Sequence, residues 1–259
     1  MPKRLVYLMF VCTVAVGFVL PVQSAEPSFK HKTLTRWLQI YQKAAQNTPE
    51  EVASTEAIRA IGTNALPTLV RMLKTRDINV QQSAETGFSI LGSVAAPAIP
   101  ELAVIMHGTN QIMSLFAATS LGRIGPPALP GLMAALTNRD YNLATLGALG
   151  ISELGSNAIP AVPIFLRDLR SQNLFARERA ADTLGNLALE PETVVPALTN
   201  LLNDVSLPTR CLVLGAIGHF HAAAKPAIPV IFPLLQDPEV TVRISATNAL
   251  HDIAPDLSN

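Results

Sequence analysis

The residues of this 259-residue chain best suited to bind a metal ion stand near its end. His219 and His221 flank Phe220, and Asp252 follows His219 after an interval of 33 residues, with His251 beside it. Two imidazoles and a carboxylate form a ligand set that transition metals accept. Histidines two positions apart do not share a helix face, however, so their rings would point in different directions. We therefore expect solvated histidines at helix ends and no metal site.

Residues for covalent or acid–base chemistry occur without the spacing that such chemistry needs. Ser89 and Ser152 each follow a glycine by two positions but lack the second glycine of a nucleophile elbow. The chain has no phosphate-binding glycine loop with lysine, no Cys-x-x-Cys and no His-Glu-x-x-His. Adjacent carboxylates such as Glu50 and Glu51 suit the first turn of a helix, where negative charge meets the helix dipole. We expect a protein that is not an enzyme and holds no cofactor.

The elements that would carry these residues repeat along the chain. Turns made of a small residue, an apolar residue and proline recur every 30–36 residues. Proline is tolerated in the first turn of a helix, where its missing N–H would be unpaired. Each turn therefore predicts the start of a first helix of about ten residues. The prolines are Pro67, Pro100, Pro130, Pro160, Pro196 and Pro229.

A second helix is predicted after each first helix, from apolar anchors that recur every 30 or 33 residues. A small residue usually stands four positions before each anchor, where it lets neighbouring helices approach closely. Glycine often stands four positions after it, where a left-handed residue ends a helix. The anchors are Ile58, Phe88, Leu121, Ile151, Leu184, Ile217 and Leu250.

Helix pairs of this length cannot bury their apolar faces alone, but stacked pairs can. The pattern predicts an all-α fold, a right-handed α-α superhelix (solenoid) of about seven helix pairs. Residues 25–62 would form an N-terminal capping pair, and residues 63–259 a repeat array continuous with it in one domain. No long stretch alternates with the period of two that strands need, so no sheet is expected.

The last repeat reads Asp-Pro-Glu-Val-Thr-Val-Arg-Ile-Ser-Ala-Thr-Asn-Ala-Leu over residues 237–250, and it resembles HEAT repeats of the short bacterial kind also seen in phycobilin lyases. The resemblance extends over residues 50–254. It implies a ladder between repeats, built from an Asp in the turn between the two helices and an Arg six residues later. The implied ladder residues are Arg177, Asp204, Arg210, Asp237 and Arg243.

The ladder pattern weakens toward the N-terminus. Ser171 stands at the Asp position before Arg177, and Gln81, Ser114 and Ala144 stand at the Arg position of earlier repeats. We interpret the arginines as structural rather than as an anion site. The front of the solenoid should depend more on apolar packing, so truncating a C-terminal ladder residue should cost more stability than truncating Gln81.

The first 24 residues have the pattern of a secretory signal peptide. Lys3 and Arg4 precede sixteen uncharged residues, Pro21 breaks the run, and small residues precede a cleavage site after Ser24. We expect an exported protein, periplasmic or extracellular, with no transmembrane segment once the signal is cleaved. An uncleaved membrane anchor is the alternative, because the apolar run is near the lower length limit of a spanning helix.

Cleavage would leave Cys211 as the single cysteine, since Cys12 lies within the signal. Its apolar neighbours favour a buried, unreactive thiol. The basic segment over residues 30–43 has apolar residues at helical spacing around Trp37. We favour an N-terminal cap of the solenoid for this segment, and a membrane-binding amphipathic helix is the alternative.

The net charge and its distribution limit the kinds of partner that this protein could bind. Nineteen Lys and Arg balance nineteen Asp and Glu, which argues against a general nucleic-acid binder. The distribution is uneven, because eight acidic and three basic residues stand from Asp182 to the end. Second helices usually line the concave side of such solenoids. The predicted concave binding face consists of Thr119, Arg123, Glu153, Asp182, Asn186, His219, Asn248 and Asp252.

These features favour a non-catalytic binding or scaffold module that offers a polar concave face to a protein or peptide. Two alternatives stay open. One is an enzyme that handles a small molecule, by analogy with bilin lyases. The other is a structural spacer with no specific ligand.

Overall fold

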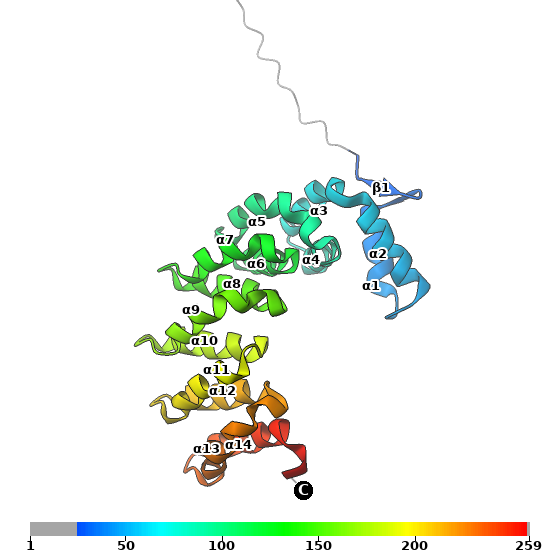
Figure 1. Cartoon of the computed structure of the whole chain (residues 1–259). Coiled ribbons are helices and arrows are strands. Elements are labelled where there is room, and N and C mark those ends of the chain that lie inside the picture. The colour runs from blue at the N-terminus through cyan, green and yellow to red at the C-terminus, as the bar shows by residue number, and fades with distance from the viewer. Residues whose placement is uncertain (1–24, 258–259) are drawn as a thin grey trace, which may run out of the picture.

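A computed structural model of the chain describes residues 25–257. Within them, fourteen α-helices form seven successive pairs, most of them joined by short 3₁₀ segments. Figure 1 shows the pairs stacked into one elongated, curved array. The predicted all-α superhelical fold is therefore confirmed. The predicted signal peptide, residues 1–24, lies outside the described residues.

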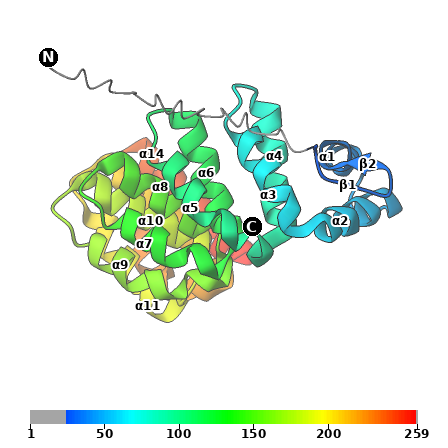
Figure 2. The same cartoon turned by 90° about the horizontal axis from the view of Figure 1, so that it is seen from above.

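The two helices of each pair lie in different layers. Figure 2 shows α7, α9 and α11 on one side of the stack and α6, α8 and α14 on the other. The first helices are α1 (Leu34–Lys43), α3 (Leu66–Leu73), α5 (Ile99–Met106), α7 (Leu129–Leu136), α9 (Val162–Asp168), α11 (Pro191–Thr199) and α13 (Ile228–Ile231). The second helices are α2 (Pro49–Ile61), α4 (Ile78–Leu91), α6 (Gln111–Ile124), α8 (Tyr141–Ser152), α10 (Leu174–Leu187), α12 (Leu207–Gly218) and α14 (Val240–Ile253).

Proline begins most first helices, as predicted. Two starts differ from the prediction. Helix α9 begins at Val162, because a 3₁₀ segment contains Pro160. Helix α11 begins at Pro191, so that Pro196 lies inside it. The prolines in the first turns of α3, α5, α7 and α13 are Pro67, Pro100, Pro130 and Pro229.

Both ends of most second helices are specified locally. Gly92 ends α4 with φ +52° and ψ −133°, a conformation that residues with a side chain rarely adopt. Ala188 takes the left-handed conformation at the end of α10. Each second helix except α14 starts with a residue whose side chain accepts a hydrogen bond from a first-turn N–H. These capping residues are Thr48, Asp77, Asn110, Asp140, Asn173 and Ser206.

Small residues set the spacing between helices in the core, where all seven predicted anchors are buried. A Cβ added at Gly147 would lie 2.5 Å from the Leu136 backbone nitrogen, so α7 and α8 pack backbone against backbone. A Cβ added at Gly122 would overlap the Gly150 carbonyl oxygen, so α6 and α8 of neighbouring repeats also meet at glycine. Close approach thus occurs both within a pair and between pairs.

A short hairpin precedes the first helix, where no strand was expected. Ser28–Phe29 (β1) pairs antiparallel with Lys32–Thr33 (β2). Lys30 and His31 between them both have positive φ, as the central residues of a tight two-residue hairpin turn do. Strands of two residues are too short to show the alternation from which strands are predicted.

The apolar side of the basic N-terminal segment faces the protein interior. Leu34, Trp37 and Leu38 of α1 are buried. The Trp37 indole N–H donates to the Phe29 carbonyl oxygen at 3.0 Å, and the Lys32 ammonium lies 4.6 Å from the centre of the Trp37 ring. This burial is the arrangement expected of a cap, with Ile40 and Tyr41 of α1 half-buried.

Residues Ile78–Met106 are long and apolar enough to span a membrane, judged by length and composition alone. They do not form one straight helix. Helix α4 ends at Gly92, a 3₁₀ segment containing Pro97 follows, and α5 begins at Ile99. Helix α4 packs against α3 and α6, and α5 packs against α6, so this apolar stretch belongs to the stacked array.

Candidate functional site

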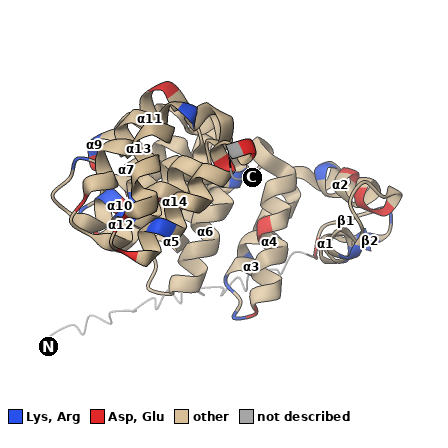
Figure 3. Cartoon of the chain, turned by 90° about the horizontal axis from the view of Figure 1, so that it is seen from below, with Lys and Arg blue, Asp and Glu red and all other residues tan. Residues whose placement is uncertain are grey.

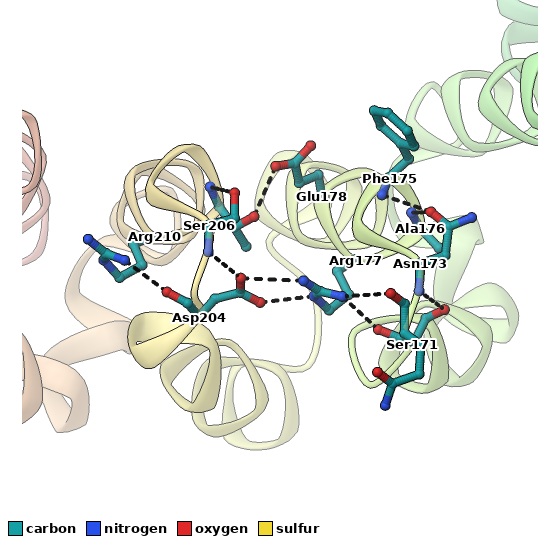
Figure 4. A network of polar contacts seen from close by, with 11 residues as sticks. Ser171, Asn173, Phe175, Ala176, Arg177, Glu178, Asp204, Ser206 and Arg210 are labelled. Atoms are coloured by element: carbon teal, nitrogen blue, oxygen red, sulfur yellow. Dashed lines mark hydrogen bonds and ion pairs between the residues drawn. The ribbon is translucent and has the colours of Figure 1, made fainter.

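Arg177 connects two repeats through Asp204 (Figure 4). Its guanidinium on α10 pairs with both carboxylate oxygens of Asp204, at 2.9 and 3.3 Å. The same guanidinium donates to the Ser171 carbonyl oxygen of its own turn at 2.9 Å. The two side chains are only 15% and 7% exposed. A bidentate pair shielded from solvent in this way fixes one repeat against the next.

Arg210 and Arg243 bind their own turns instead. Arg210 donates to the Asp204 carbonyl oxygen at 2.9 Å, and Arg243 donates to the Asp237 carbonyl oxygen at 2.6 Å. Within residues 25–257, no ion pair within 4.0 Å joins Arg210 to Asp237. The ion pair between neighbouring repeats is therefore Arg177–Asp204, one repeat earlier than the complete Asp and Arg pattern at the C-terminal end implied. It forms at the repeat whose own turn has Ser171 in place of Asp.

Two earlier residues at the Arg position make the same turn contact with a different donor, which the sequence interpretation missed. The Gln81 amide donates to the Thr75 carbonyl oxygen at 2.9 Å, and the Ser114 hydroxyl donates to the Gly108 carbonyl oxygen at 3.2 Å. In both cases the acceptor stands six residues before the donor, as it does for the arginines. The signal that could have identified this contact is a side-chain donor seven residues before the anchor, which every pair has except the first, with Glu51, and the fourth, with Ala144. The repeats of Gln81 and Ser114 thus keep this polar contact, which the expectation of a front that depends more on apolar packing had left out.

The substitution Gln81→Ala is expected to destabilise the protein by about 2 kcal/mol, because it leaves buried acceptors without a donor. Gln81 is 1% exposed and donates to both Leu73 and Thr75. Denaturant unfolding followed by circular dichroism measures the change. The control Gln82→Ala alters the exposed side of the same helix and should stay within about 0.5 kcal/mol of wild type. Equally small effects of both changes would contradict the anchoring role.

The residues predicted for the concave face all lie on second helices or at their ends, and those at the front are already engaged. Arg123 at the end of α6 pairs with Glu85 of α4 at 3.6 Å and with Glu153 after α8 at 3.1 Å. Thr119 is half-buried, and its hydroxyl donates to carbonyl oxygens of its own helix. Arg123 thus links three successive repeats, and its charge is balanced within the protein.

The C-terminal part of the predicted face is exposed to solvent. Asp182, Asn186, His219, Asn248 and Asp252 are all exposed, on or next to α10, α12 and α14. The Asn186 amide donates to the Asp182 carboxylate at 3.3 Å. Among the described residues, no ion pair within 4.0 Å reaches either Asp182 or Asp252. Figure 3 shows that Lys, Arg, Asp and Glu are thinly spread over an array made mostly of other residues.

The ring of His221 contacts the backbone of the next repeat. His221 has a φ of +48°, at the register where earlier repeats have glycine. Its Nδ1 lies 3.4 Å from the Asp252 backbone oxygen, and so the ring contacts the main chain and not the carboxylate. Within the described part of the chain, no group of three His, Cys, Asp or Glu side chains is arranged to hold a metal ion.

Cys211 is half-buried on α12, whereas a buried thiol was predicted. It lines a surface hollow together with Leu207, Pro208 and Ile244. The position faces the next second helix, α14, but the two helices leave space between their N-terminal halves.

Comparison with known proteins identifies the repeat. The family model for the HEAT repeat matches residues 227–257, the last helix pair. No curated protein matches the sequence. Among solved structures, an engineered protein from a structural genomics consortium is similar with a TM-score of 0.42 and 21% identity, over 73% of this chain and 96% of that one. The complex of CpcE and CpcF of phycocyanin lyase from a Nostoc species is similar with a TM-score of 0.49 and 25% identity, over 61% of this chain and 66% of that one.

Proposed function

Because the chain is an array of HEAT-like repeats, we propose that it is a non-catalytic, exported binding module that presents its second helices to a protein or peptide partner. Each repeat contacts only its neighbours, so the second helices together form one long face. A partner would meet several repeats at once. Export is part of the proposal, because the array follows a signal-like segment over residues 1–24.

One observation carries this proposal: the exposed polar row along the C-terminal halves of α10 and α14 and at the end of α12. Asp182, Asn186, His219, Asn248 and Asp252 are exposed, whereas the anchors on the same helices are buried. These side chains therefore belong neither to the core nor to the ladder. Carboxylates without an ion pair favour a partner of opposite charge.

Co-purification from the native envelope fraction tests the proposal. Tagged wild-type protein is compared with the Asp182→Lys/Asp252→Lys double variant, whose stability should change by less than about 1 kcal/mol because both sites are exposed. We expect a protein partner that the wild type retains, that the variant retains about tenfold less, and that added salt weakens.

Other outcomes would contradict the proposal. A partner that both proteins retain equally would place the interface elsewhere. A coloured or small-molecule adduct in place of a protein would favour the lyase-like alternative. Recovery of the bare chain from repeated purifications would favour a structural spacer.

A further inference from the structure

Large apolar side chains lie exposed along the N-terminal halves of the second helices. We call this surface the apolar band, and define it by Ile112, Leu115, Tyr141, Phe175 and Ile244. These side chains are between 44% and 55% exposed. They come from α6, α8, α10 and α14. Single exposed hydrophobic residues are normal, but a contiguous set marks an interaction surface.

The apolar band is continuous from α6 to α10. A hollow of about 510 Å³ between α6 and α8 is lined by Leu115, Tyr141 and Leu146. On the other side of α8, the Tyr141 ring contacts the Phe175 ring of α10, with ring centres 5.2 Å apart. Three successive repeats therefore contribute to one apolar surface, into which a bulky side chain fits between α6 and α8.

A second hollow repeats this arrangement between α12 and α14. It measures about 390 Å³ and is lined by Leu207, Pro208, Cys211 and Ile244. Cys211 stands six residues before its anchor, the same register that Leu115 holds beside the first hollow. The two hollows thus recur at one level of the solenoid.

Acidic residues share these helix faces with the apolar band. On α10, Phe175 and Asp182 are seven residues apart, and on α14, Ile244 and Asp252 are eight apart. Residues seven or eight apart lie on one side of a helix, two turns from each other. Each of these helices therefore presents an apolar side chain near its start and an unpaired carboxylate near its end.

The guanidiniums of α10 do not cancel this negative charge. Arg177 pairs with Asp204 at 2.9 Å, and Arg179 pairs with Asp168 at 3.6 Å. Both arginine side chains are at most 15% exposed. Further forward, Arg123 is matched by two carboxylates. Glu178 of α10 is half-buried and accepts from the Thr209 hydroxyl, and Arg243 of α14 is half-buried and donates to the carbonyl oxygens of its own turn. Asp182 and Asp252 are therefore the exposed carboxylates of α10 and α14 without an ion pair in the described residues.

We propose that this face binds an amphipathic peptide segment, with large apolar side chains along one side and Lys or Arg along the other. The apolar side chains would enter the two hollows, and the cations would face Asp182 and Asp252. This inference rests on the proposed binding function and specifies the chemistry of its partner. Neighbouring helices stack about 10 Å apart, so the two carboxylates are about 20 Å apart. A helical segment spans that distance with about 13 residues.

Binding of designed peptides to the purified protein tests the inference. The two hollows lie three helix spacings apart, about 30 Å. The probe is therefore a fluorescent peptide of about 24 residues, which is about 36 Å long as a helix, with Leu on one side and Lys on the other. Fluorescence anisotropy should show saturable binding that weakens as salt is added. A peptide with Glu in place of Lys, and one with Ala in place of Leu, should each bind at least about tenfold more weakly.

Substitutions of the aromatic and of the acidic residues on this face test whether they form the binding site. Tyr141→Ala/Phe175→Ala should weaken binding of the Leu–Lys peptide about tenfold, because it removes the aromatic part of the surface. Asp182→Lys/Asp252→Lys should weaken it by a similar factor, through charge reversal. Circular dichroism checks that each variant keeps its helices.

Matched controls alter other faces of the protein. Val104→Ala removes a side chain that is 73% exposed on α5, outside the second-helix layer. Glu190→Lys/Glu192→Lys makes the same change in net charge at the start of α11, where both residues are exposed. Both controls should bind the Leu–Lys peptide as the wild type does.

Two results would overturn the inference: equal binding of the Leu–Lys and Leu–Glu peptides, or wild-type affinity in both double variants. A native partner that depends on Asp182 and Asp252, combined with no binding of the Leu–Lys peptide, would refute the amphipathic chemistry and leave the proposed function standing. If neither a native protein partner nor binding of the Leu–Lys peptide is found, both the proposed function and this inference are refuted.

Discussion

The substitution Gly122→Ala is expected to destabilise the protein by about 3 kcal/mol, at the upper end of the usual cost of overpacking. The added Cβ would overlap the Gly150 carbonyl oxygen and lie 2.6 Å from the Glu153 Cβ. A backbone carbonyl within α8 cannot rotate away as a flexible side chain would. The helices α6 and α8 must therefore separate, which also opens the contact between two repeats. Thermal unfolding followed by circular dichroism should show a melting temperature lower by about 6–12 °C.

Gly131→Ala is the matched control for this change. Gly131 is exposed on α7, and no heavy atom lies within 4 Å of the position that its Cβ would take. Alanine in an exposed helix position should stabilise by about 0.5–1 kcal/mol, because it restricts the unfolded chain. Opposite signs for two identical glycine-to-alanine changes would show that contact between backbones governs the effect. A Gly122→Ala variant that melts with the wild type would mean that α6 and α8 are not packed this closely.

Asp204→Ala is expected to cost about 3 kcal/mol, because it leaves the Arg177 guanidinium without its partner in a site mostly closed to water. The carboxylate also accepts the Ser206 N–H at 2.8 Å, which is lost in the same variant. The comparison is Asp237→Ala, whose carboxylate accepts the Glu239 N–H at 2.9 Å. Without an ion pair to Arg210, that change should cost only about 1 kcal/mol.

A double-mutant cycle isolates the ion pair from the turn contact. The variants Arg177→Ala, Asp204→Ala and their combination are unfolded with denaturant, and we expect a coupling free energy of about 1–3 kcal/mol. The same cycle on Arg210 and Asp237 should give about zero, since no ion pair within 4.0 Å joins them in the described residues. Equal coupling in both cycles would restore the C-terminal ladder that the sequence pattern implied.

The helix pairs were predictable because their signals act over short distances in the chain. Proline constrains φ and is tolerated in a first turn, glycine such as Gly92 permits the positive φ that ends α4, and apolar anchors follow helical periodicity. Each of these effects depends on residues within one or two turns. The exceptions have local causes as well: Pro191 starts α11 earlier than Pro196, and the hairpin over residues 28–33 is too short to show a strand pattern.

The sequence predicted the positions of the ladder residues but not which of them form an ion pair. The position of Arg177 and Arg210 in the repeat predicts that each donates to a carbonyl oxygen of the preceding turn. It does not predict which carboxylate each guanidinium pairs with. Gln81 shows the same limit, since an amide at that register bonds the turn as an arginine does. Whether an ion pair forms depends on the distance between neighbouring turns, which the stacking of whole repeats sets.

For the candidate face, the sequence predicts which residues turn outward but not which of them are paired or covered. Its polar residues follow from periodicity, because positions two residues from a buried anchor cannot also face the core. Pairing of Arg123 with Glu85 and Glu153, and contact of Tyr141 with Phe175, join residues that lie 30–38 positions apart. Periodicity within one helix specifies which side chains turn outward. The packing of neighbouring repeats determines which of these are covered, which charges stay open and where apolar side chains gather, since each depends on atoms from a different helix.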